Sequence, residues 1–520
     1  MEINYGNKSF ENIVLTLVYK YNYILNIMGS GIVQLASTGR QDKLFNYKPT
    51  ITFFKSMYKR HTNYASQSMP QHFNIKPDFG SKVSCTIANL ADLLGKINLV
   101  IDLPPIGNFY DIISDSGSGN SNVACCAWVK NIGYQIIKSV EIQLDDKILE
   151  KQMHDWFNIY HELHKDLNME FATNKMIGNV PELTDFTINK NSYTLMVPLQ
   201  FWFNRYPNMA FPIVSTYNST VKINVEFSSL DDCLILGPTH YVEIEEEICL
   251  FVKGDILHQN VNGIMYLYKF IFHDPVDKRL YYIKITKETL KTNVAIYLGK
   301  NKNYHVLPIG TERLYLNKKK YFGPTNNLAL GKTYLWVDFI FLEAKERRKF
   351  IKNKLDYVID VVQFDNEQII YQSSDTVKIN HSNPCKELIF VCSNEYLYNG
   401  YMKDKFNYSN NMEQTEDLIL KALINMNSQE RLTEKNFSYY NKLHPVKYHS
   451  SSSKGIGLYS FGSRVEGHQY AGYCNLSEIS NLEIKFRLSK TVSRNRPVQM
   501  RIYTIALRKL TFENGMVSLE

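Results

Sequence analysis

Two histidines on one predicted helix come closest to a catalytic metal motif in this sequence. In YHELHK (160–165), Glu162 lies between His161 and His164. The metalloprotease pattern H-E-x-x-H places its histidines four residues apart on one helix face, with the Glu as general base. Here the spacing is one residue short, and no third ligand is evident nearby. The pattern therefore favours a solvated helix end over a metal site.

Other segments that could bind phosphate or perform catalysis are equally incomplete. In SDSGSGNSN (114–122), Gly117 and Gly119 lack the third glycine of a dinucleotide-binding loop, and the composition is that of a loop tip. The basic run KERRK (345–349) contains Glu346, which favours a solvated helix face. No G-x-S-x-G motif, P-loop or paired-carboxylate constellation occurs. The sequence predicts no catalytic, cofactor-binding or metal-binding residue and no enzyme.

Composition sets the broad class of the protein. A chain of 520 residues exceeds what one core usually organises, so two or three domains are expected. Aromatic residues make up 13%, which favours strands and close-packed contact surfaces. The net charge of +8 is a mild basic bias, weaker than that of a dedicated nucleic-acid binder. Eight scattered cysteines without C-x-x-C spacing predict reduced, mostly buried thiols.

Short strand-like segments fall into two groups, at roughly 50–230 and 333–520. Each is rich in β-branched or aromatic residues and bounded by Gly, Pro, Asn or Asp. The first group comprises 72–79, 81–90, 95–103, 136–144, 193–203 and 221–227, and the second 333–342, 355–364, 386–393, 455–463, 481–488 and 498–507. Helical periodicity is confined to DWFNIYHEL (155–163) and EAKERRKFI (343–351). This pattern predicts two antiparallel sandwiches in tandem.

The region between these groups, 232–330, has its own character. It opens with the acidic EIEEEI (243–248) and ends with the basic LNKKKYFG (316–323). Strand-like pieces such as MYLYKFIF (265–272) and RLYYIKITK (279–287) keep its apolar content high. We expect an inserted β-rich subdomain here.

The segment PTITFFKSMYKRHTNYA (49–65) combines aromatic and basic residues without a break. Read as a strand, it is partly apolar on both faces. This predicts a strand over 49–58 that is covered on two sides and runs out into an edge that carries Lys59, Arg60 and His61.

Several of these motifs together resemble a known family. The run 49–65, preceded by GSGIVQLASTGRQD (29–42), is similar to the first-strand signature of the double jelly-roll major capsid proteins of nucleocytoplasmic large DNA viruses. The resemblance covers most of 29–231 and 331–515, in order. It continues through SVEIQLDDKILEKQMHDWFNIYHEL (139–163), PLQFWFNRYPNMAFPIVS (198–215), LWVDFIFLEAKERRKF (335–350), NPCKELIFV (383–391), GLYSFGSRVEGHQYAGYCNLSEISN (457–481) and RIYTIALRKL (501–510).

The resemblance implies an all-β fold of two tandem eight-stranded jelly rolls, with short helices in loops and a β-rich insert between the rolls. We expect an N-terminal arm or extension at 1–28, a first jelly roll at 29–231, the insert or junction at 232–330 and a second jelly roll at 331–520. At the N-terminus, Met28 stands directly before the family-like Gly29, which favours a start at Met28. The alternative is a real arm that grips a neighbouring subunit through its apolar residues.

The implied function is that of a structural capsid protein whose trimeric, pseudo-hexagonal capsomers tile an icosahedral shell assembled in the host cytoplasm. The implied partners are two further copies of the chain, neighbouring capsomers and minor capsid proteins, without direct contact to nucleic acid. The trimer interface is predicted to be rich in aromatic and basic residues and to include part of 198–212, where Phe201, Trp202, Phe203 and Tyr206 exceed what one strand face can bury. Lys59, Arg60 and His61 would lie near an intersubunit or interlobe contact or simply be solvated.

Two alternatives to the principal role remain open: a specialised minor capsid paralogue and a carbohydrate-binding jelly-roll protein. Glycans on the outer surface are also a possibility, because Asn-x-Ser/Thr triplets occur in the chain, although such triplets also arise by chance. The triplets begin at Asn7, Asn218, Asn380, Asn407, Asn436 and Asn475.

Overall fold

The computed structural model describes residues 30–37, 39–42, 47–107, 125–187, 189–246, 249–275, 277–298, 301–314, 328–411, 414–451, 454–467, 469 and 471–520. The chain divides into two compact units, Met1–His61 and Thr62–Glu520. The expectations for 1–28, 114–122 and 316–323 lie outside the described residues, as does the sequon at Asn7.

The first unit contains one short helix in its described part and no strand there. Helix α2 spans Ser30–Ala36, and the residues from 49 to 63 have no regular hydrogen-bonded structure. The strand predicted over 49–58 is therefore wrong, because the described part of this unit offers no second strand to pair with its backbone. The first strand is β1 (Tyr64–His72), so the strand predicted at 72–79 contributes only His72.

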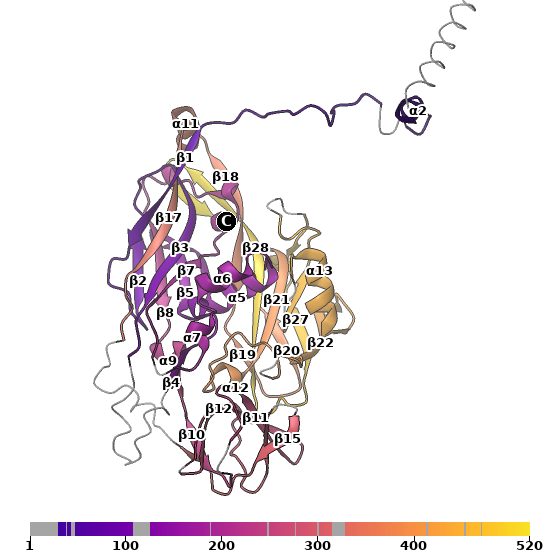
Figure 1. Cartoon of the computed structure of the whole chain (residues 1–520). Coiled ribbons are helices and arrows are strands. Elements are labelled where there is room, and N and C mark those ends of the chain that lie inside the picture. The colour runs from indigo at the N-terminus through magenta and orange to yellow at the C-terminus, as the bar shows by residue number, and fades with distance from the viewer. Residues whose placement is uncertain are drawn as a thin grey trace, which may run out of the picture. The chain divides into compact units, whose positions relative to one another are not determined.

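The second unit begins with a jelly roll of two four-stranded sheets. Numbered by their order along the chain, its eight strands are arranged 1-8-3-6 in one sheet and 2-7-4-5 in the other. The first sheet is β1, β17 (Thr333–Leu342), β3 (Leu93–Leu103) and β7 (Tyr193–Pro198), and the second is β2 (Lys82–Thr86), β8 (Val221–Phe227), β5 (Ile137–Leu144) and β6 (Lys147–Met153). The colours in Figure 1 show the distant β17 lying among the early strands.

The remaining strands build a second jelly roll with the same strand order. Its first sheet is β18 (Leu355–Phe364), β28 (Val498–Glu513), β21 (Pro384–Asn394) and β25 (Ile456–Ser460). Its second sheet is β20 (Ser374–Ile379), β27 (Leu482–Leu488), β22 (Ile419–Met426) and β23 (Gln429–Glu430), with β24 (Lys435–Asn436) also on β22. Short strands β19 (Gln368–Ile370) and β29 (Met516–Leu519) pair with β28, and β26 (Cys474–Asn475) pairs with β21.

Hydrophobic alternation explains the individual strands. In β8, VKINVEF, every second side chain is buried, as expected for a sheet with one face toward the core. In β21, PCKELIFVCSN, nearly every side chain is buried, because this sheet is covered on both faces. One cover is the other sheet of its own roll, and the other includes helix α5 (His154–Leu163) of the first roll. Trp156, Ile159 and Leu163 of α5 supply that contact.

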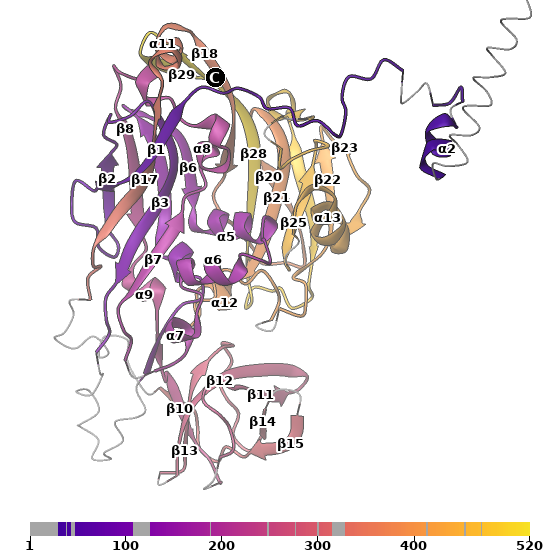
Figure 2. The same cartoon turned by 45° about the horizontal axis from the view of Figure 1, so that its top comes forward.

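Within the region 232–330, seven strands between His240 and Leu314 form a separate sheet with its own core. The strand order is β15-β14-β11-β12-β13-β10-β16. The strands are β10 (His240–Glu243), β11 (Ile256–Val261), β12 (Ile264–Asp274), β13 (Arg279–Lys284), β14 (Ile296–Leu298), β15 (Asn301–Val306) and β16 (Arg313–Leu314). Figure 2 shows this sheet at one end of the unit, below the two jelly rolls. We call it the insert sheet.

The insert sheet interrupts the first jelly roll rather than separating the two rolls. Strand β17, at the start of the segment expected to form the second roll from residue 331, pairs with β1 and β3. The chain leaves the first roll after β8, passes through β9 (Leu234–Gly237), which pairs with β4 (Cys125–Trp128), and returns in β17. Ile271 and Ile283 of the insert sheet also join the core of the first roll. The expected boundary at residue 331 would assign β17 to the second roll, whereas the strand pairing assigns β17 to the first roll.

Short helices connect the strands. Both predicted helices are confirmed, as α5 and as α11 (Ala344–Lys352), whose basic residues are exposed. The other α-helices in the described part of the second unit are α4 (Ile132–Gln135), α6 (Glu170–Ile177), α7 (Pro181–Thr184), α8 (Trp202–Arg205), α9 (Leu230–Cys233), α12 (Glu395–Tyr398) and α13 (His444–Tyr448). Within the described ranges no helix combines the length and apolar character that crossing a membrane requires. All eight cysteines are free, and six are buried, as predicted.

Candidate functional site

Among the residues that the structure describes, the most exposed large apolar side chains lie in the segment 51–58, ITFFKSMY. Phe53, Phe54 and Tyr58 are 91%, 99% and 91% exposed. Lys59 and Arg60, which follow directly, are also exposed. Aromatic side chains contribute strongly to interfaces when they are buried, and soluble monomers rarely leave several of them in water together. This segment is therefore a candidate contact surface for another protein chain.

Three consecutive aromatic residues of the run 198–212 lie in the core, whereas Tyr206 is half-buried. Phe201, Trp202 and Phe203 are each at most 1% exposed. After β7 ends at Pro198 the chain turns into α8, so these side chains no longer alternate between two sheet faces and all point into protein. Nearby Phe211 packs edge-to-face on Phe512 of the second roll, with 5.4 Å between ring centroids. The predicted trimer interface at 201–203 is wrong, because these residues help to join the two rolls.

A buried ion pair also connects the two rolls. Asp155 of α5 and Arg501 of β28 approach to 2.9 Å, and each side chain is 2% exposed. The Arg501 guanidinium lies 4.6 Å from the ring centroid of Tyr398. Burial alone opposes the charge on Arg501, but the neighbouring Asp155 carboxylate raises the pKa of Arg501 above its ordinary value. Removing either partner would leave an uncompensated charge inside the protein.

Glu150 of β6 is a second buried acid at this contact. Its Oε1 accepts hydrogen bonds from Gln152 at 2.8 Å and from the backbone N–H of Val362 at 3.2 Å. The guanidinium of Arg205 is 3.9 Å away, and Oε2 is buried without a hydrogen-bond partner among the described residues. Burial raises the pKa of Glu150 to about 7, although Arg205 opposes the rise. An acid in this position titrates near neutral pH.

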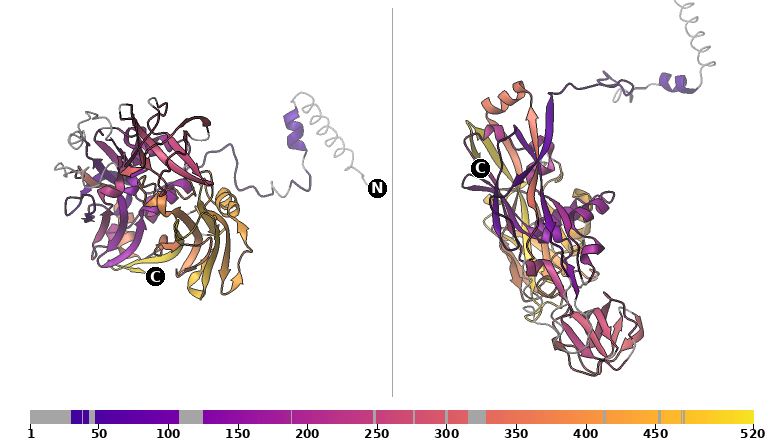
Figure 3. Two further views of the ribbon diagram at one scale, coloured as in Figure 1. Left: turned by 90° about the horizontal axis from the view of Figure 1, so that it is seen from below. Right: turned by 60° about the vertical axis from the view of Figure 1, so that its left-hand side comes forward.

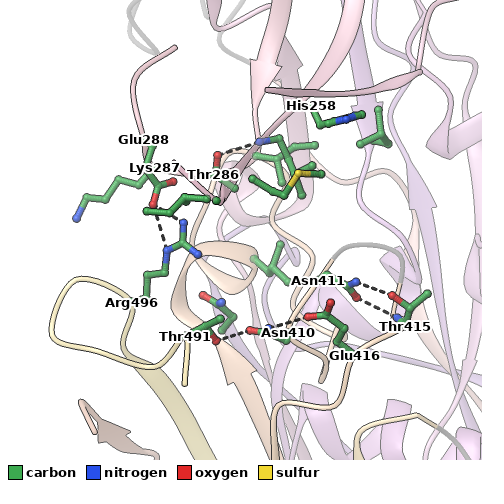
Figure 4. Close-up of a pocket in the computed structure, with 18 residues that line it drawn as sticks. His258, Thr286, Lys287, Glu288, Asn410, Asn411, Thr415, Glu416, Thr491 and Arg496 are labelled. Carbon is green, nitrogen blue, oxygen red and sulfur yellow. Dashed lines mark hydrogen bonds and ion pairs between the residues drawn. The ribbon is translucent and has the colours of Figure 1, made fainter. Parts of the chain in front are cut away.

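A pocket of about 510 Å³ lies between the insert sheet and the second jelly roll. Its apolar side comes mainly from the insert sheet, and its polar side comes from loops of the second roll. Figure 4 shows the Arg496–Glu288 ion pair closing one side, where Arg496 Nε lies 3.1 Å from Glu288 Oε1. The apolar residues are Ile256, Ile264, Met265, Leu267, Ile285 and Leu397.

Hydrogen bonds order the polar side of this pocket. Asn410 donates to Glu416 at 3.0 Å and accepts from Thr491 at 2.8 Å. Asn411 donates to Thr415 at 2.6 Å. Among the residues that line the pocket in the described part of the chain there is no Trp, Tyr or Phe, so it lacks the aromatic platform expected of a carbohydrate site. The pocket is therefore best described as part of the contact between the insert sheet and the second roll.

The two histidines of YHELHK lie in different surroundings. His161 packs against Tyr134 of the first roll, with ring centroids 5.9 Å apart. His164, one turn further along the chain, approaches His449 and Glu466 of the second roll. Nothing local in the sequence could identify this group, because its members are brought together only by the packing of the two rolls.

The sequons differ in accessibility. Asn407 is fully buried, and its side chain donates to Asp404 and to the carbonyl of Asn411. Asn218, Asn380 and Asn436 are exposed, and Asn475 is half-buried. Of the five sequons within the described residues, these last four could be reached by a modifying enzyme in the folded chain.

Comparison with known proteins gives one consistent group. Residues 52–251 match the family model "Major capsid protein N-terminus", and residues 346–517 match "Large eukaryotic DNA virus major capsid protein". "Probable capsid protein 4" of Acanthamoeba polyphaga mimivirus is 33% identical over 517 residues, covering 95% of this chain and 99% of the relative. The "Major capsid protein" of Phaeocystis pouchetii virus is 25% identical, with 95% and 99% coverage.

Solved structures show the same fold. The PBCV-1 virus capsid structure aligns with a TM-score of 0.60 at 20% identity, covering 90% of this chain and 99% of that chain. The Faustovirus major capsid protein aligns with a TM-score of 0.62 at 11% identity, covering 89% and 93%. At these identities the likeness concerns the fold alone.

Proposed function

The chain belongs to the family of large eukaryotic DNA virus major capsid proteins and is a structural protein of the capsid shell, and from this premise we propose that three copies form one capsomer. The observation that carries the proposal is the repeated strand order, 1-8-3-6 over 2-7-4-5, in both jelly rolls of one chain. Two similar lobes in each of three copies give six lobes around one axis. A closed three-fold ring of this kind has a nearly hexagonal outline and can tile a shell.

The exposed apolar side chains of the segment 51–58 support the proposal that this segment is buried against another copy of the chain. Phe53, Phe54 and Tyr58 would lose apolar surface to water on contact with a partner, at about 25 cal/mol for each Å² buried. Because this segment lies in the unit Met1–His61, the capsomer would use an N-terminal extension in addition to the faces of its jelly rolls. Neighbouring capsomers and minor capsid proteins are the other partners that we propose. The exposed Asn218, Asn380 and Asn436 are the positions that we propose for any outer glycans.

We propose a revised division of the chain for this assembly. The first jelly roll takes residues 62–231 together with 328–342, and the insert sheet is an excursion between its seventh and eighth strands. The second jelly roll takes residues 355–520. This division is supported by the pairing of β17 with β1 and β3 and by the separate core of the insert sheet.

Light scattering coupled to size-exclusion chromatography tests the trimer. We expect the purified full chain to elute with three times the monomer mass of 60.6 kDa. A variant with Phe53, Phe54 and Tyr58 replaced by Ser should shift toward the monomer, whereas its circular dichroism spectrum should stay unchanged. A parent chain that remains monomeric at micromolar concentration contradicts the proposal.

A specialised capsid paralogue is the second candidate role. The chain is 33% identical to mimivirus "Probable capsid protein 4" over 95% of its length, but 28% identical to "Capsid protein 1" of the same virus over 70%. Quantitative mass spectrometry of virions separates the two roles. A principal shell protein should dominate the virion protein mass, and a paralogue should occur at a small fraction of it.

A further inference from the structure

We propose that His164, His449 and Glu466 form a binding site for one Zn²⁺ ion at the contact between the two jelly rolls. His164 directly follows α5 of the first roll, and His449 directly follows α13 of the second roll. A bound ion would therefore connect the two rolls of one chain. This inference does not depend on how copies of the chain assemble.

The ligand atoms are close enough for one ion. His449 Nδ1 lies 3.6 Å from Glu466 Oε1, and His164 Nε2 lies 3.8 Å from the same oxygen. All three ligand atoms are within 4.8 Å of one another. Tetrahedral Zn²⁺ with bonds of about 2.0–2.1 Å needs ligand atoms about 3.3 Å apart. Small side-chain rotations would therefore close the site around an ion.

Hydrogen bonds at the far side of each imidazole fix the nitrogen that faces the site. His164 Nδ1 lies 2.9 Å from the backbone carbonyl of Tyr160, which can only accept, so Nδ1 carries the proton and Nε2 keeps its lone pair. His449 Nε2 lies 2.7 Å from the buried carboxylate of Glu387. Metal-binding histidines usually donate their second N–H to a carbonyl or a carboxylate in this way.

The position of His449 Nδ1, which faces the Glu466 carboxylate, also supports a ligand shared by the two residues. His449 is 1% exposed in its side chain, and its Nδ1 is buried without a hydrogen-bond partner among the described residues. A buried polar atom without a partner is costly and calls for an explanation. Nδ1 points toward Glu466, at the distance given above, so an ion between them would satisfy both groups.

The site is reachable and ordered. His164 and Glu466 are 25% and 33% exposed in their side chains, so an ion and one water ligand can enter from that side. The backbone N–H of Ser450 donates to Glu466 Oε1 at 2.7 Å and holds the carboxylate in place. Two imidazoles and one carboxylate are a donor set that suits Zn²⁺, with water in the fourth position.

A proton on His449 Nδ1 is the competing occupant. Burial lowers the pKa of His449, but Glu387 and Glu466 outweigh it and raise the pKa to about 9. Zn²⁺ binding at Nδ1 would have to displace that proton and would release it. The two occupants therefore predict different results in a titration.

Titration of the chelator-treated full chain with ZnCl2 tests the proposal. Isothermal titration calorimetry at pH 7.5 should give one Zn²⁺ per chain, with proton release that is visible as a buffer-dependent heat. Co²⁺ in place of Zn²⁺ should produce the visible absorption of a tetrahedral site. The melting temperature should rise with added Zn²⁺.

Three variants locate the site. His164→Gln and Glu466→Gln should each weaken Zn²⁺ binding at least tenfold, because even residues behind metal ligands contribute that much. His161→Gln is the matched control on the same helix and should bind like the parent. Circular dichroism of the metal-free variants checks that they fold. Absence of a stoichiometric site in the parent, or equal affinity in all three variants, would overturn the proposal.

Discussion

Replacing Glu150 with Gln should make the protein more stable at pH 8 and leave it little changed at pH 5. The substitution keeps the shape of the side chain and removes its charge. Glu150 is 2% exposed, and Arg205 is too distant, at 3.9 Å, for a hydrogen bond. Gln can still accept the hydrogen bonds from Gln152 and Val362 through its carbonyl oxygen. Its amide also supplies a donor at the position of Oε2, as a protonated carboxyl does.

The size of the effect follows from the pKa. Burial raises the pKa of Glu150 from its ordinary 4.5 to about 7. A raised pKa means that the folded state holds the proton more tightly than the unfolded state, so this contribution to stability is complete below pH 4.5. It is lost as the pH rises through 7. One pKa unit corresponds to about 1.4 kcal/mol, so the parent should lose up to about 3 kcal/mol that the Gln variant keeps.

Urea unfolding of parent and variant, at intervals from pH 4.5 to 8.5, measures the difference directly. The free energy of unfolding of the variant should exceed that of the parent by an amount that grows through this range. Glu141→Gln is the control of opposite sign. Burial also disfavours the Glu141 carboxylate, but Lys151 and Lys82 together lower its pKa, so that variant should lose stability at neutral pH. A Glu150→Gln variant that is destabilised equally at pH 5 and pH 8 would refute the reasoning.

Three further perturbations have expected outcomes. Asp155→Ala should lower the free energy of unfolding by about 3–5 kcal/mol, because Arg501 keeps a buried charge without its carboxylate partner. The double variant Asp155→Ala with Arg501→Met should recover part of this loss in urea titrations, and no recovery would show that the pair does not act as a unit. Trp202→Ala should cost about 3–5 kcal/mol in urea unfolding of the isolated chain, and a parent-like unfolding midpoint would contradict its place in the core. Replacing residues 240–327 with a flexible Gly/Ser linker should leave a soluble chain with both jelly rolls folded, as judged by near-ultraviolet circular dichroism. The larger deletion 232–330 also removes β9 and its pairing with β4, so it should be less stable; equal insolubility of both deletions would show that the insert sheet is required for folding.

Much of the strand pattern could be predicted from the sequence. The predicted bounds of β8, β17 and β18 agree with the observed ones, because alternating or near-continuous apolar residues end there at polar or turn-forming residues. Helix α5 was predicted from the spacing of Trp156, Ile159 and Leu163, and these residues do face one core. Segments with such local periodicity therefore form the helix or strand that their sequence predicts.

Features that depend on distant partners could not be predicted in the same way. The segment 51–58 has the composition of a strand, yet its described unit provides no strand beside it. Phe201 and Trp202 suggested an interface because their number exceeds one strand face, but the turn into α8 brings both into the core. His164 lacked a third ligand locally, whereas His449 and Glu466 reach it from the second roll.

The pairing of β17 shows how the first jelly roll tolerates its insert. In the second roll, nine residues join β27 to β28, whereas 105 residues join β8 to β17 in the first. Closing an unstructured loop of that length would cost about 2 kcal/mol more. However, β10 and β16, the first and last strands of the insert sheet, pair with each other. The folded insert sheet therefore returns the chain beside its point of departure, so the first roll needs only a short connection on either side. In the right-hand view of Figure 3 this sheet lies at one end of the unit, as that explanation requires.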